Sequence, residues 1–375
     1  MGVQVRSVDG AMGRARFVDV PFRLFGSEPE WVPPLRMSVR DRISPKHPAM
    51  EHQRVALWIA YEGGKAVGRI GACVDATFNT FQDLSWAWVG FFESVDRTDV
   101  ADALFQVAWA WAGEQGMRTC VGPASFTTND ELGLLVEGRE HPPTLMTTHN
   151  PAYYEKLWLG GGWSPTMDLW AWQFLADGPM SISERQRAVL DRLQARSPFK
   201  LRNAVMRDFD AEVARFFDIY NAAWSHNWGF APMTKAEVSH LAKNLKLIVE
   251  PDLALLIDGP NGETVAAALA VPDVNQTISR LRNGRLLPFG WARLLAGRHK
   301  VSQARILLLG VRPEYEVQGV GPILYSTLME RMGADPRLSL VEASWTLGTN
   351  QKMNSALEAM GAAHHKTWRL YDRQL

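Results

Sequence analysis

The feature that most constrains the fold is a repeated order of elements, because two stretches of this 375-residue chain predict the same unit. Residues 58–73 and 253–271 each predict an apolar hairpin with a glycine-containing turn. Further along, residues 150–172 repeat in order the landmarks of residues 350–371, which are an asparagine, a short helix, a glycine and an aromatic strand. We therefore expect two copies of one unit of mixed α/β (α+β) class.

A strand, a glycine turn and the start of a helix are predicted for residues 306–324, within the second copy. Gly319 and Gly321 lack a Cβ, so backbone N–H groups can approach an anion closely. The helix that follows points its free N–H groups and the positive end of its dipole at the same place. The spacing excludes a Walker loop, a dinucleotide fingerprint and a nucleophile elbow. The sequence therefore predicts a phosphate-binding turn.

Residues 316–321, Glu-Val-Gln-Gly-Val-Gly, resemble the acyl-CoA-binding loop of the GNAT N-acetyltransferase superfamily, whose pattern is Arg/Gln-x-x-Gly-x-Gly/Ala. Residues 227–230, 272–275 and 342–345 are similar to a group of two-domain proteins of that superfamily. The resemblance implies two tandem GNAT-like domains, each a mixed, mostly antiparallel sheet flanked by helices. It also implies an N-acyltransferase that uses acetyl-CoA, or another acyl-CoA, as co-substrate.

By this resemblance, the acyl-CoA lies along the strand end, the glycine turn and the start of the last helix. The residues concerned are Leu309, Gly310, Val311, Gln318, Gly319, Val320, Gly321, Pro322 and Asn350. Two positions depart from the family pattern. Glu316 replaces the first Arg or Gln, and an acid beside a pyrophosphate is unfavourable unless it points to solvent. Leu357 replaces the tyrosine that often protonates the departing thiolate, so the acid comes from elsewhere or is water.

Glu342 is our first choice for the base that deprotonates the acceptor amine, because it lies in the strand next to the expected site. Partial burial would raise its pKa towards a useful range; a salt-bridged structural carboxylate is the alternative. Tyr371 is the candidate acid, with an aromatic core residue as its alternative. Near the site no clear nucleophile for an acyl-enzyme is seen, which favours direct attack of the amine in a ternary complex.

An aromatic cluster precedes the predicted helix start at Thr234 and is expected to line the acceptor pocket. The predicted substrate residues are Tyr220, Trp224, Asn227, Trp228 and, from a later loop, Asn275. Such a wall favours a partly apolar or planar amine, or a cation held by ring faces; ordinary core packing is the alternative. Residues 280–300 are rich in arginine, and two interpretations stay open for them: contact with the CoA phosphates, or a solvated basic insertion.

The two copies predict a first domain over residues 1–178, a linker over 179–198 and a second domain over 199–375. In the first copy, the turn at 93–99 has no glycine and carries carboxylates that would repel a pyrophosphate. We therefore expect a degenerate first domain and acyl-CoA chemistry in the second. The polar loop 122–131 is expected to close over the second site or to form the domain interface.

Charge and composition narrow the partners further. Lys+Arg and Asp+Glu are equal at 40 each, so there is no global basic field for nucleic acid or anionic lipid. No apolar run is long enough for a membrane span. We expect a cytoplasmic enzyme without a metal, since His364 and His365 have no carboxylate or cysteine at ligand spacing. The expected partner is a small-molecule or peptide amine, and a homodimer is left open. Cys73 and Cys120 are predicted to be buried free thiols.

Two alternative functions stay open at this point. One is a non-catalytic ligand-binding or scaffold protein that kept the fold, since a fold does not fix a function. The other is a transferase that uses a larger acyl donor, either fatty-acyl or aminoacyl, in the same pocket. The length of the pocket would distinguish this enzyme from an acetyltransferase.

Overall fold

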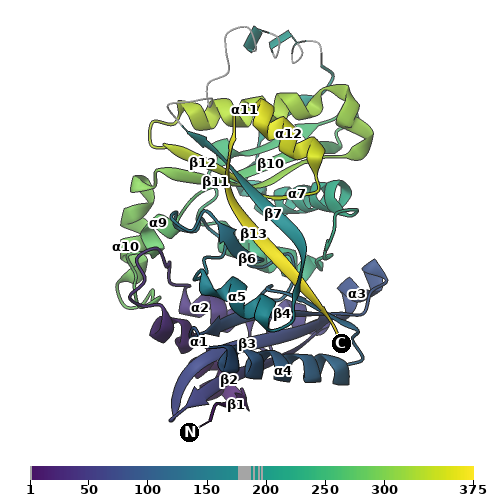
Figure 1. Ribbon diagram of the computed structural model, residues 1–375. Helices are drawn as coiled ribbons and strands as arrows, with labels where there is room; N and C mark the ends of the chain where they lie inside the picture. The colour runs from purple at the N-terminus through teal and green to yellow at the C-terminus, as the bar shows by residue number, and fades with distance from the viewer. Residues whose placement is uncertain (1, 176–186, 189–190, 193–194, 196) are drawn as a thin grey trace.

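The computed structural model describes residues 2–175, 187–188, 191–192, 195 and 197–375, so most of the predicted linker lies outside the described residues. One continuous sheet runs through the molecule, in the order β1-β2-β3-β4-β5-β13-β7-β12-β11-β10-β9-β8, with β6 beside β13 (Figure 1). Two neighbouring pairs in this sheet, β4–β5 and β11–β12, are parallel and the other pairs are antiparallel. The predicted class, a mixed and mostly antiparallel sheet flanked by helices, is confirmed.

The strands are β1 (Gln4–Ser7), β2 (Gln53–Glu62), β3 (Lys65–Asp75), β4 (Trp86–Ser94), β5 (Thr119–Gly122), β6 (Leu134–Glu137), β7 (Ser164–Leu175), β8 (Lys200–Asn203), β9 (Ala254–Asp258), β10 (Thr264–Pro272), β11 (Gln303–Val311), β12 (Leu340–Leu347) and β13 (Ala363–Gln374). The α-helices are α1 (Gly10–Leu24), α2 (Arg36–Arg42), α3 (Ala76–Gln82), α4 (Thr98–Glu114), α5 (Tyr153–Gly160), α7 (Phe209–Trp224), α8 (Lys235–Leu245), α9 (Asn275–Ile278), α10 (Gly290–Gly297), α11 (Val320–Ala334) and α12 (Gln351–Ala359). Short 3₁₀ segments include η1 (Pro48–Glu51) and η5 (Pro313–Gln318).

The two copies exchange their last strands at the centre of the sheet. β7 ends the first copy, yet it pairs with β12 of the second copy and with β13. β13 ends the second copy, and it pairs with β5 of the first copy as well as with β7. In Figure 1 these two long strands cross the middle of the molecule side by side. The exchange joins both copies into one sheet without a break.

Helices cover both faces of the second half of the sheet, as the alternation of side chains along β9 shows. Leu255 and Ile257 belong to the core that also contains Ile323 and Leu324 of α11. The residues that alternate with them, Ala254 and Leu256, pack with α7 on the other face. This period of two is what a strand buried on both faces requires. The second half is therefore a three-layer structure with α11 and α7 on opposite sides.

In the first half, α4 and α5 pack against the sheet through aromatic rings. Phe105 of α4 stacks on Phe92 with centroids 5.0 Å apart, and it meets Trp158 of α5 edge-on at 5.2 Å. Cys73 and Cys120 are buried free cysteines, as predicted. Among the described residues, no helix combines the length and the apolar character needed to cross a membrane.

Candidate active site

The parallel strands β11 and β12 separate part-way along their length. Their pairing runs from Gln303 opposite Leu340 to Ile306 opposite Ala343 and then ends. At the same point the register of β11 with β10 shifts, because Leu308 pairs with Leu269 and Ile306 pairs with Ala270. Leu307 is thus an extra residue in a β-bulge, which bends the strand. The two strands therefore diverge after Ile306.

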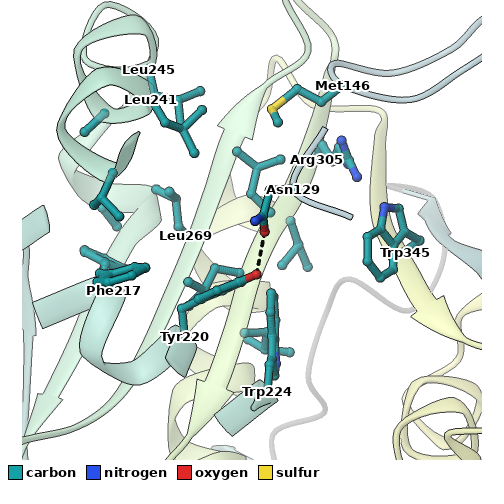
Figure 2. A pocket seen from close by; sticks show the side chains of 18 of the residues that line it. Asn129, Met146, Phe217, Tyr220, Trp224, Leu241, Leu245, Leu269, Arg305 and Trp345 are labelled. Atoms are coloured by element: carbon teal, nitrogen blue, oxygen red, sulfur yellow. Dashed lines mark hydrogen bonds between the residues drawn. The ribbon is translucent and has the colours of Figure 1, made fainter. Parts of the chain in front are cut away.

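A cavity of about 330 Å³ extends from this opening across the sheet under α7 and α8 (Figure 2). Its floor includes Trp345 of β12, Leu308 of β11, Leu269 of β10 and Ala254 of β9. Adjacent strands lie ~4.8 Å apart, so three spacings from β12 to β9 give a length of roughly 14 Å. The cavity is therefore long in the direction that crosses the strands. An acetyl group would occupy only the first few ångströms of this length.

The roof of the cavity is the apolar face of α8 together with α7. Val238, Leu241, Ala242 and Leu245 line it from α8, at the i, i+3, i+4 and i+7 positions of one helix face. From α7 it receives Val213, Phe216 and Phe217. The helix α8 begins at a capping box, in which Thr234 and Glu237 exchange side-chain and backbone hydrogen bonds. The roof of the cavity is thus mostly hydrocarbon.

Four of the five predicted substrate residues line this cavity: Tyr220, Trp224, Asn227 and Trp228. The Tyr220 hydroxyl donates to Asn129 Oδ1 at 2.6 Å, a contact that Figure 2 shows, and burial raises the pKa of this phenol. The fifth residue, Asn275, is not among the lining residues. It begins α9, and its side-chain amide donates to the carbonyl of Pro143 at 3.0 Å.

Loop 122–131 of the first half contributes to the wall of the second half's cavity, the first of the two positions expected for it. Thr128, Asn129 and Asp130 are all lining residues. The Thr128 hydroxyl donates to the carbonyl of Gly229 at 2.6 Å, and Asn129 Nδ2 donates to the carbonyl of Ala231 at 2.9 Å. The first copy therefore supplies one wall of a cavity that otherwise belongs to the second copy.

The predicted phosphate turn has an open, strand-to-helix geometry. Gly319 has φ +76° and caps α11, a backbone conformation that L side chains rarely adopt. A Cβ built there would meet no atom within 4 Å, so the space beside the backbone is open. Val320 and Gly321 open α11, and Pro322 follows as a residue without an N–H. Glu316 forms an ion pair with Lys352 of α12 on the surface, which balances the charge that departs from the family pattern.

The remaining predicted acyl-CoA residues lie in two groups. Leu309 and Asn350 line the cavity, and Asn350 also caps α12 by accepting the N–H of Met353 at 3.1 Å. The other three do not line it. Gly310 packs against Ile219 of α7, Val311 is in the core beneath α11, and the Gln318 side chain donates to the carbonyl of Glu314.

The carboxylate of Glu342 is fully buried beside the cavity and is held by three donors. Ser344 and Thr144 donate their hydroxyls to Oε1, each at 2.6 Å, and Lys366 Nζ lies 3.2 Å from Oε2. Burial opposes ionisation, but Lys366, the two hydroxyls and Arg305 outweigh it and hold the pKa of Glu342 below its usual range. The expected increase in this pKa is therefore wrong, because burial brings a cation and two donors with it.

Ser344 connects this buried carboxylate to the cavity. Ser344 and Arg305 are both lining residues. Arg305 Nε donates to Ser344 Oγ at 3.0 Å, and its other nitrogens reach the carbonyls of Ser344 and Leu145. Burial lowers the pKa of Arg305 to about 10, so the guanidinium stays charged at neutral pH. Glu342 can thus exchange a proton with the cavity through one hydroxyl.

Tyr371 lies elsewhere, in the core of the first half. It pairs with Gly122 on β5 and packs against Trp158 of α5 with centroids 5.7 Å apart. Its hydroxyl donates to Glu155 at 3.5 Å, and burial raises the pKa of the phenol. It is not a lining residue of the cavity. The strand exchange explains this position, since β13 leaves the second half to join β5.

Comparison with known proteins finds two relatives that match nearly the whole chain. No protein-family model matches the chain. Over 366 residues, covering 96% of this chain and 92% of the relative, it is 34% identical to protein YghO of Escherichia coli (strain K12). Over 372 residues, covering 96% of this chain and 94% of the relative, it is 37% identical to the bacterial ceramide synthase of Caulobacter vibrioides (strain NA1000 / CB15N). The chain belongs to the family of these two proteins.

Solved structures identify the fold of this family. A tandem GNAT protein from the clavulanic acid biosynthesis pathway superposes with a TM-score of 0.58 at 12% identity, covering 99% of this chain and 98% of that one. A GCN5-related N-acetyltransferase from Sphaerobacter thermophilus gives 0.52 at 13% identity, covering 99% and 95%. The tandem GNAT fold inferred from the glycine turn is confirmed.

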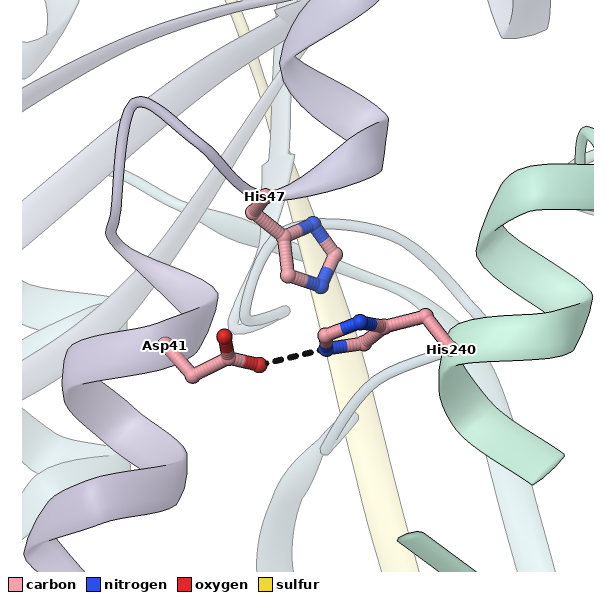
Figure 3. A group of neighbouring side chains, drawn as sticks. All are labelled: Asp41, His47 and His240. Carbon is pink, nitrogen blue, oxygen red and sulfur yellow. Dashed lines mark hydrogen bonds and ion pairs between the residues drawn. The ribbon is translucent and has the colours of Figure 1, made fainter. Parts of the chain in front are cut away.

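One group of side chains in the described part of the chain could hold a metal ion: Asp41, His47 and His240 (Figure 3). The sequence did not indicate the contact between Asp41 and His240, because the two residues are 199 positions apart. His240 Nε2 lies 2.6 Å from Asp41 Oδ2, and His47 Nδ1 accepts the N–H of Ala49 at 3.3 Å. A neutral His47 with that bond carries its proton on Nε2, which then has no lone pair for a metal. The contact between His240 and Asp41 links α8 to α2.

Sequence reasoning missed Ser344, Arg305 and the face of α8 as parts of the site. The helical spacing of Val238, Leu241, Ala242 and Leu245 was a signal for an apolar face, though not for what it covers. For Arg305 and Ser344 the only available signal was a polar residue within an otherwise apolar strand. Their meeting depends on the pairing of β11 with β12.

Proposed function

We propose that this family member is an acyl-CoA-dependent N-acyltransferase that transfers a fatty-acyl group to the amine of a lipophilic acceptor. The observation that carries the proposal is the cavity, which is apolar and crosses four strands from Trp345 to Ala254. An acetyl donor has no use for that length, whereas a hydrocarbon chain is stabilised along all of it. Of the alternatives left open by the sequence, the larger, fatty-acyl donor fits best.

The name of one relative indicates the acceptor. A ceramide is the amide of a fatty acid with a long-chain amino alcohol, and the Caulobacter relative is a bacterial ceramide synthase. The aromatic wall of Tyr220, Trp224 and Trp228 suits an acceptor with a hydrocarbon tail. We therefore propose a sphingoid-type base as the acceptor class for this chain.

The turn at Gly319 is suited to hold the phosphates of the CoA part of the donor. The turn at Gly319 is open, the first turn of α11 has backbone N–H groups without a partner inside the helix, and Glu316 is already paired with Lys352. The divergence of β11 from β12 after Ile306 opens into the cavity. When bound, the donor supplies a thioester carbonyl as the electrophile. The Leu309 backbone and Asn350 lie where they would contact its thiol arm.

Ser344 and Glu342 form a proton path away from the amine in this proposal. The amine nitrogen bonds to the acyl carbon, the C–S bond breaks, and the thiolate takes a proton from water. The hydroxide left behind is neutralised by the proton that Glu342 returns to solvent at the end of the cycle. The surplus proton of the amine passes to Ser344 Oγ while the Ser344 hydroxyl proton passes to Glu342, 2.6 Å away. Arg305 Nε fixes the serine from the other side. We expect Ser344→Ala and Glu342→Gln each to lower kcat by about 10²-fold or more without weakening CoA binding.

The test of the acyl donor is a chain-length series. Purified protein is incubated with sphinganine and acetyl-, octanoyl- or palmitoyl-CoA, and both the released thiol and the amide are measured. We expect palmitoyl-CoA to be preferred by at least about tenfold in kcat/KM over acetyl-CoA, because one further buried CH₂ contributes ~0.8 kcal/mol. A preference for acetyl-CoA would contradict the fatty-acyl proposal.

A pair of variants at Ala254 tests whether the cavity measures chain length. Ala254→Phe fills the far end, so the preferred donor should become octanoyl-CoA, and Ala254→Val should give an intermediate profile. Because the readout is a ratio between donors within one preparation, a partial loss of folded protein cancels. An unchanged profile in Ala254→Phe would place the acyl chain outside this cavity.

The test of the CoA site is calorimetric titration of CoA into a Gly321→Glu variant. A Cβ at this glycine lies 3.7 Å from Tyr325, so the variant should fold, while its carboxylate faces the expected phosphates. We expect at least about tenfold weaker binding, or ~1.4 kcal/mol. Asp96→Ala, in the corresponding turn of the first half, is the matched control and should bind normally. Equal binding by Gly321→Glu would move the CoA site elsewhere.

A further inference from the structure

A basic segment of the second half contains α9 and α10. Residues 274–300 contain six arginines and lysines and no aspartate or glutamate, although the whole chain has equal numbers of both charges. The segment forms a projection that reaches α1 and α2 of the first half at the edge of the molecule (Figure 1). We call residues 279–300 the basic lobe. Its charge is local, so it is invisible in the net charge of the chain.

The basic lobe also exposes large apolar side chains. Leu287, Phe289, Trp291 and Leu295 are 76%, 73%, 50% and 47% exposed, and all four fall within nine residues. Elsewhere in the described chain such residues are scattered singly over several elements, as Met12, Phe81 and Leu247 are. Scattered exposed side chains need no explanation, whereas a concentration of them marks an interaction site.

The arginines of the lobe surround a hollow of about 360 Å³ next to these apolar residues. It is lined by Arg280, Arg282, Arg285 and Arg293, with Leu287 and Phe289 at its side. Arg282 is a structural member, because it donates to the carbonyls of Gly26, Glu28 and Trp31. No carboxylate in the described residues pairs with the other three arginines. Three cations thus face outward beside exposed hydrocarbon.

The neighbouring helix α2 adds to this positive surface. Arg36 Nε donates to the carbonyl of Asn283 at 2.7 Å, which fixes the lobe against the first half. Its guanidinium pairs with Asp19. Burial, Arg285 and Arg40 together lower the pKa of Arg36, which shows that these guanidiniums lie close enough to repel one another. An anion placed between them would relieve that repulsion.

We infer that the basic lobe docks on the surface of an anionic lipid bilayer. The arginines of the hollow then lie at the level of the lipid phosphates, and Leu287, Phe289, Trp291 and Leu295 enter the interfacial region. A bilayer surface offers both parts of this chemistry side by side, anionic headgroups and hydrocarbon. Tryptophan is favoured at that depth because one end of its ring is apolar and the other donates a hydrogen bond. Nucleic acid has no counterpart to four exposed aliphatic and aromatic side chains in one patch.

The inference does not depend on the proposed function, because binding to vesicles is measured without turnover. It departs from the sequence-based expectation of no membrane partner, which rested on the net charge of the whole chain. It agrees with the finding that no described helix spans a bilayer, since docking of this kind is peripheral. For an enzyme of lipophilic amines, it would place the protein where such acceptors reside.

The first test is flotation of the full-length protein with vesicles of phosphatidylcholine alone or with phosphatidylglycerol. We expect at least about tenfold more protein to float with the anionic vesicles, and this binding to fall in high salt. The apolar variant Phe289→Ser/Trp291→Ser should lose at least about tenfold of the binding. The matched control, Met12→Ser/Leu247→Ser, removes two strongly exposed apolar side chains elsewhere and should bind normally.

The second test separates charge from apolar contact. Arg285→Glu/Arg293→Glu should abolish the preference for phosphatidylglycerol, whereas Lys46→Glu/Arg207→Glu changes the net charge equally, away from the lobe, and should keep it. Thermal melting checks that each variant folds, and the two lobe variants test the inference independently if one does not. Equal flotation with both vesicle types, or full binding by both lobe variants, would overturn it. Retention of RNA or of a protein partner without vesicle binding would also overturn it.

Discussion

The two halves of the molecule build the same pair of parallel strands and then treat the gap between them differently. In the second half, β11 and β12 separate after Ile306 and the gap opens into the cavity. In the first half, β4 and β5 pair parallel as far as Trp88 and Val121. There the chain after β5 turns back into the gap, and the N–H of Ala124 donates to the carbonyl of Val89 at 2.8 Å.

The closed gap of the first half is packed so tightly that it needs a glycine. A Cβ at Gly90 would lie 1.8 Å from the carbonyl oxygen of Ala124, and Phe126 is fully buried beside it. Beyond this plug the same loop continues to Asn129, which accepts the hydroxyl of Tyr220 in the other half. The difference teaches that one copy filled its own gap with protein and became a wall for the other. The proposed chemistry belongs to the copy whose gap stayed open.

The largest expected effect comes from separating the halves. A fragment of residues 1–178 keeps β7 but removes β12 and β13, both of its partners, and it removes the β13 ladder from β5. We expect this fragment to be insoluble or unfolded by circular dichroism, because long apolar strand edges are left unpaired. Co-expression with residues 179–375 should recover a folded complex. A soluble, cooperatively melting fragment would show that the first domain is independent of the exchange.

Alanine at two glycines compares the closed gap with the open one. Gly90→Ala forces a Cβ against a backbone carbonyl, and we expect the free energy of unfolding to fall by about 3 kcal/mol. Gly310→Ala in β11 meets only side chains, at 3.0 Å from Ile219 and 3.2 Å from Ala223, so about 1 kcal/mol is expected. Urea denaturation of both variants gives the two values. Equal losses would mean that the first gap is no more tightly filled than the second.

A smaller, pH-dependent effect is expected where the first half covers the second. Asp273 accepts the backbone N–H of Leu145 at 2.8 Å, and burial raises its pKa from 3.8 to about 7. Between these pH values the folded state binds more protons than the unfolded state, so stability falls as the pH rises. Asp273→Asn keeps the acceptor and removes the titration.

The measurement is the melting temperature of wild type and Asp273→Asn from pH 5 to pH 8. As the pH rises towards 7, the stability of the variant relative to wild type should increase by up to about 1 kcal/mol per pH unit. Above pH 7 this difference in stability should level off. A pH-independent difference would mean that this carboxyl group does not titrate in the fold. It would also mean that the contact between Asp273 and Leu145, which joins the two halves, does not depend on charge.

Much of the fold could be predicted, because it follows from local patterns. The hairpins of both copies, the strand before Gly319 and the helix after it match β2–β3, β9–β10, β11 and α11. The aromatic residues Tyr220, Trp224 and Trp228 were expected to line a pocket, with core packing as the alternative, and they line the cavity. Loop 122–131 was expected either over the second site or at the domain interface, and its residues Thr128 to Asp130 line the cavity. Its polar residues and length indicated a role away from the core.

What could not be predicted depends on pairs of residues far apart in the chain. Nothing local in the sequence distinguishes a β13 that stays with its own copy from one that crosses to β5, so Tyr371 was placed near the chemistry rather than in the first core. The pKa of Glu342 was expected to rise, because the sequence shows its burial but not the arrival of Lys366, Thr144 and Ser344. Asn275 was expected in the pocket, and its partner Pro143 lies in the other half.

The sequence by itself determined the repeat, the class of each element and the glycine turn, since hydrophobic period and turn chemistry are properties of neighbouring residues. The tertiary structure alone decided which gap stays open, how far the cavity extends and what surrounds the buried carboxylate. Those features depend on strand order, because the distance from Trp345 to Ala254 is fixed by the strands that lie between them. A repeat gives two equal copies, and only the exchange of strands and the filling of one gap make them unequal.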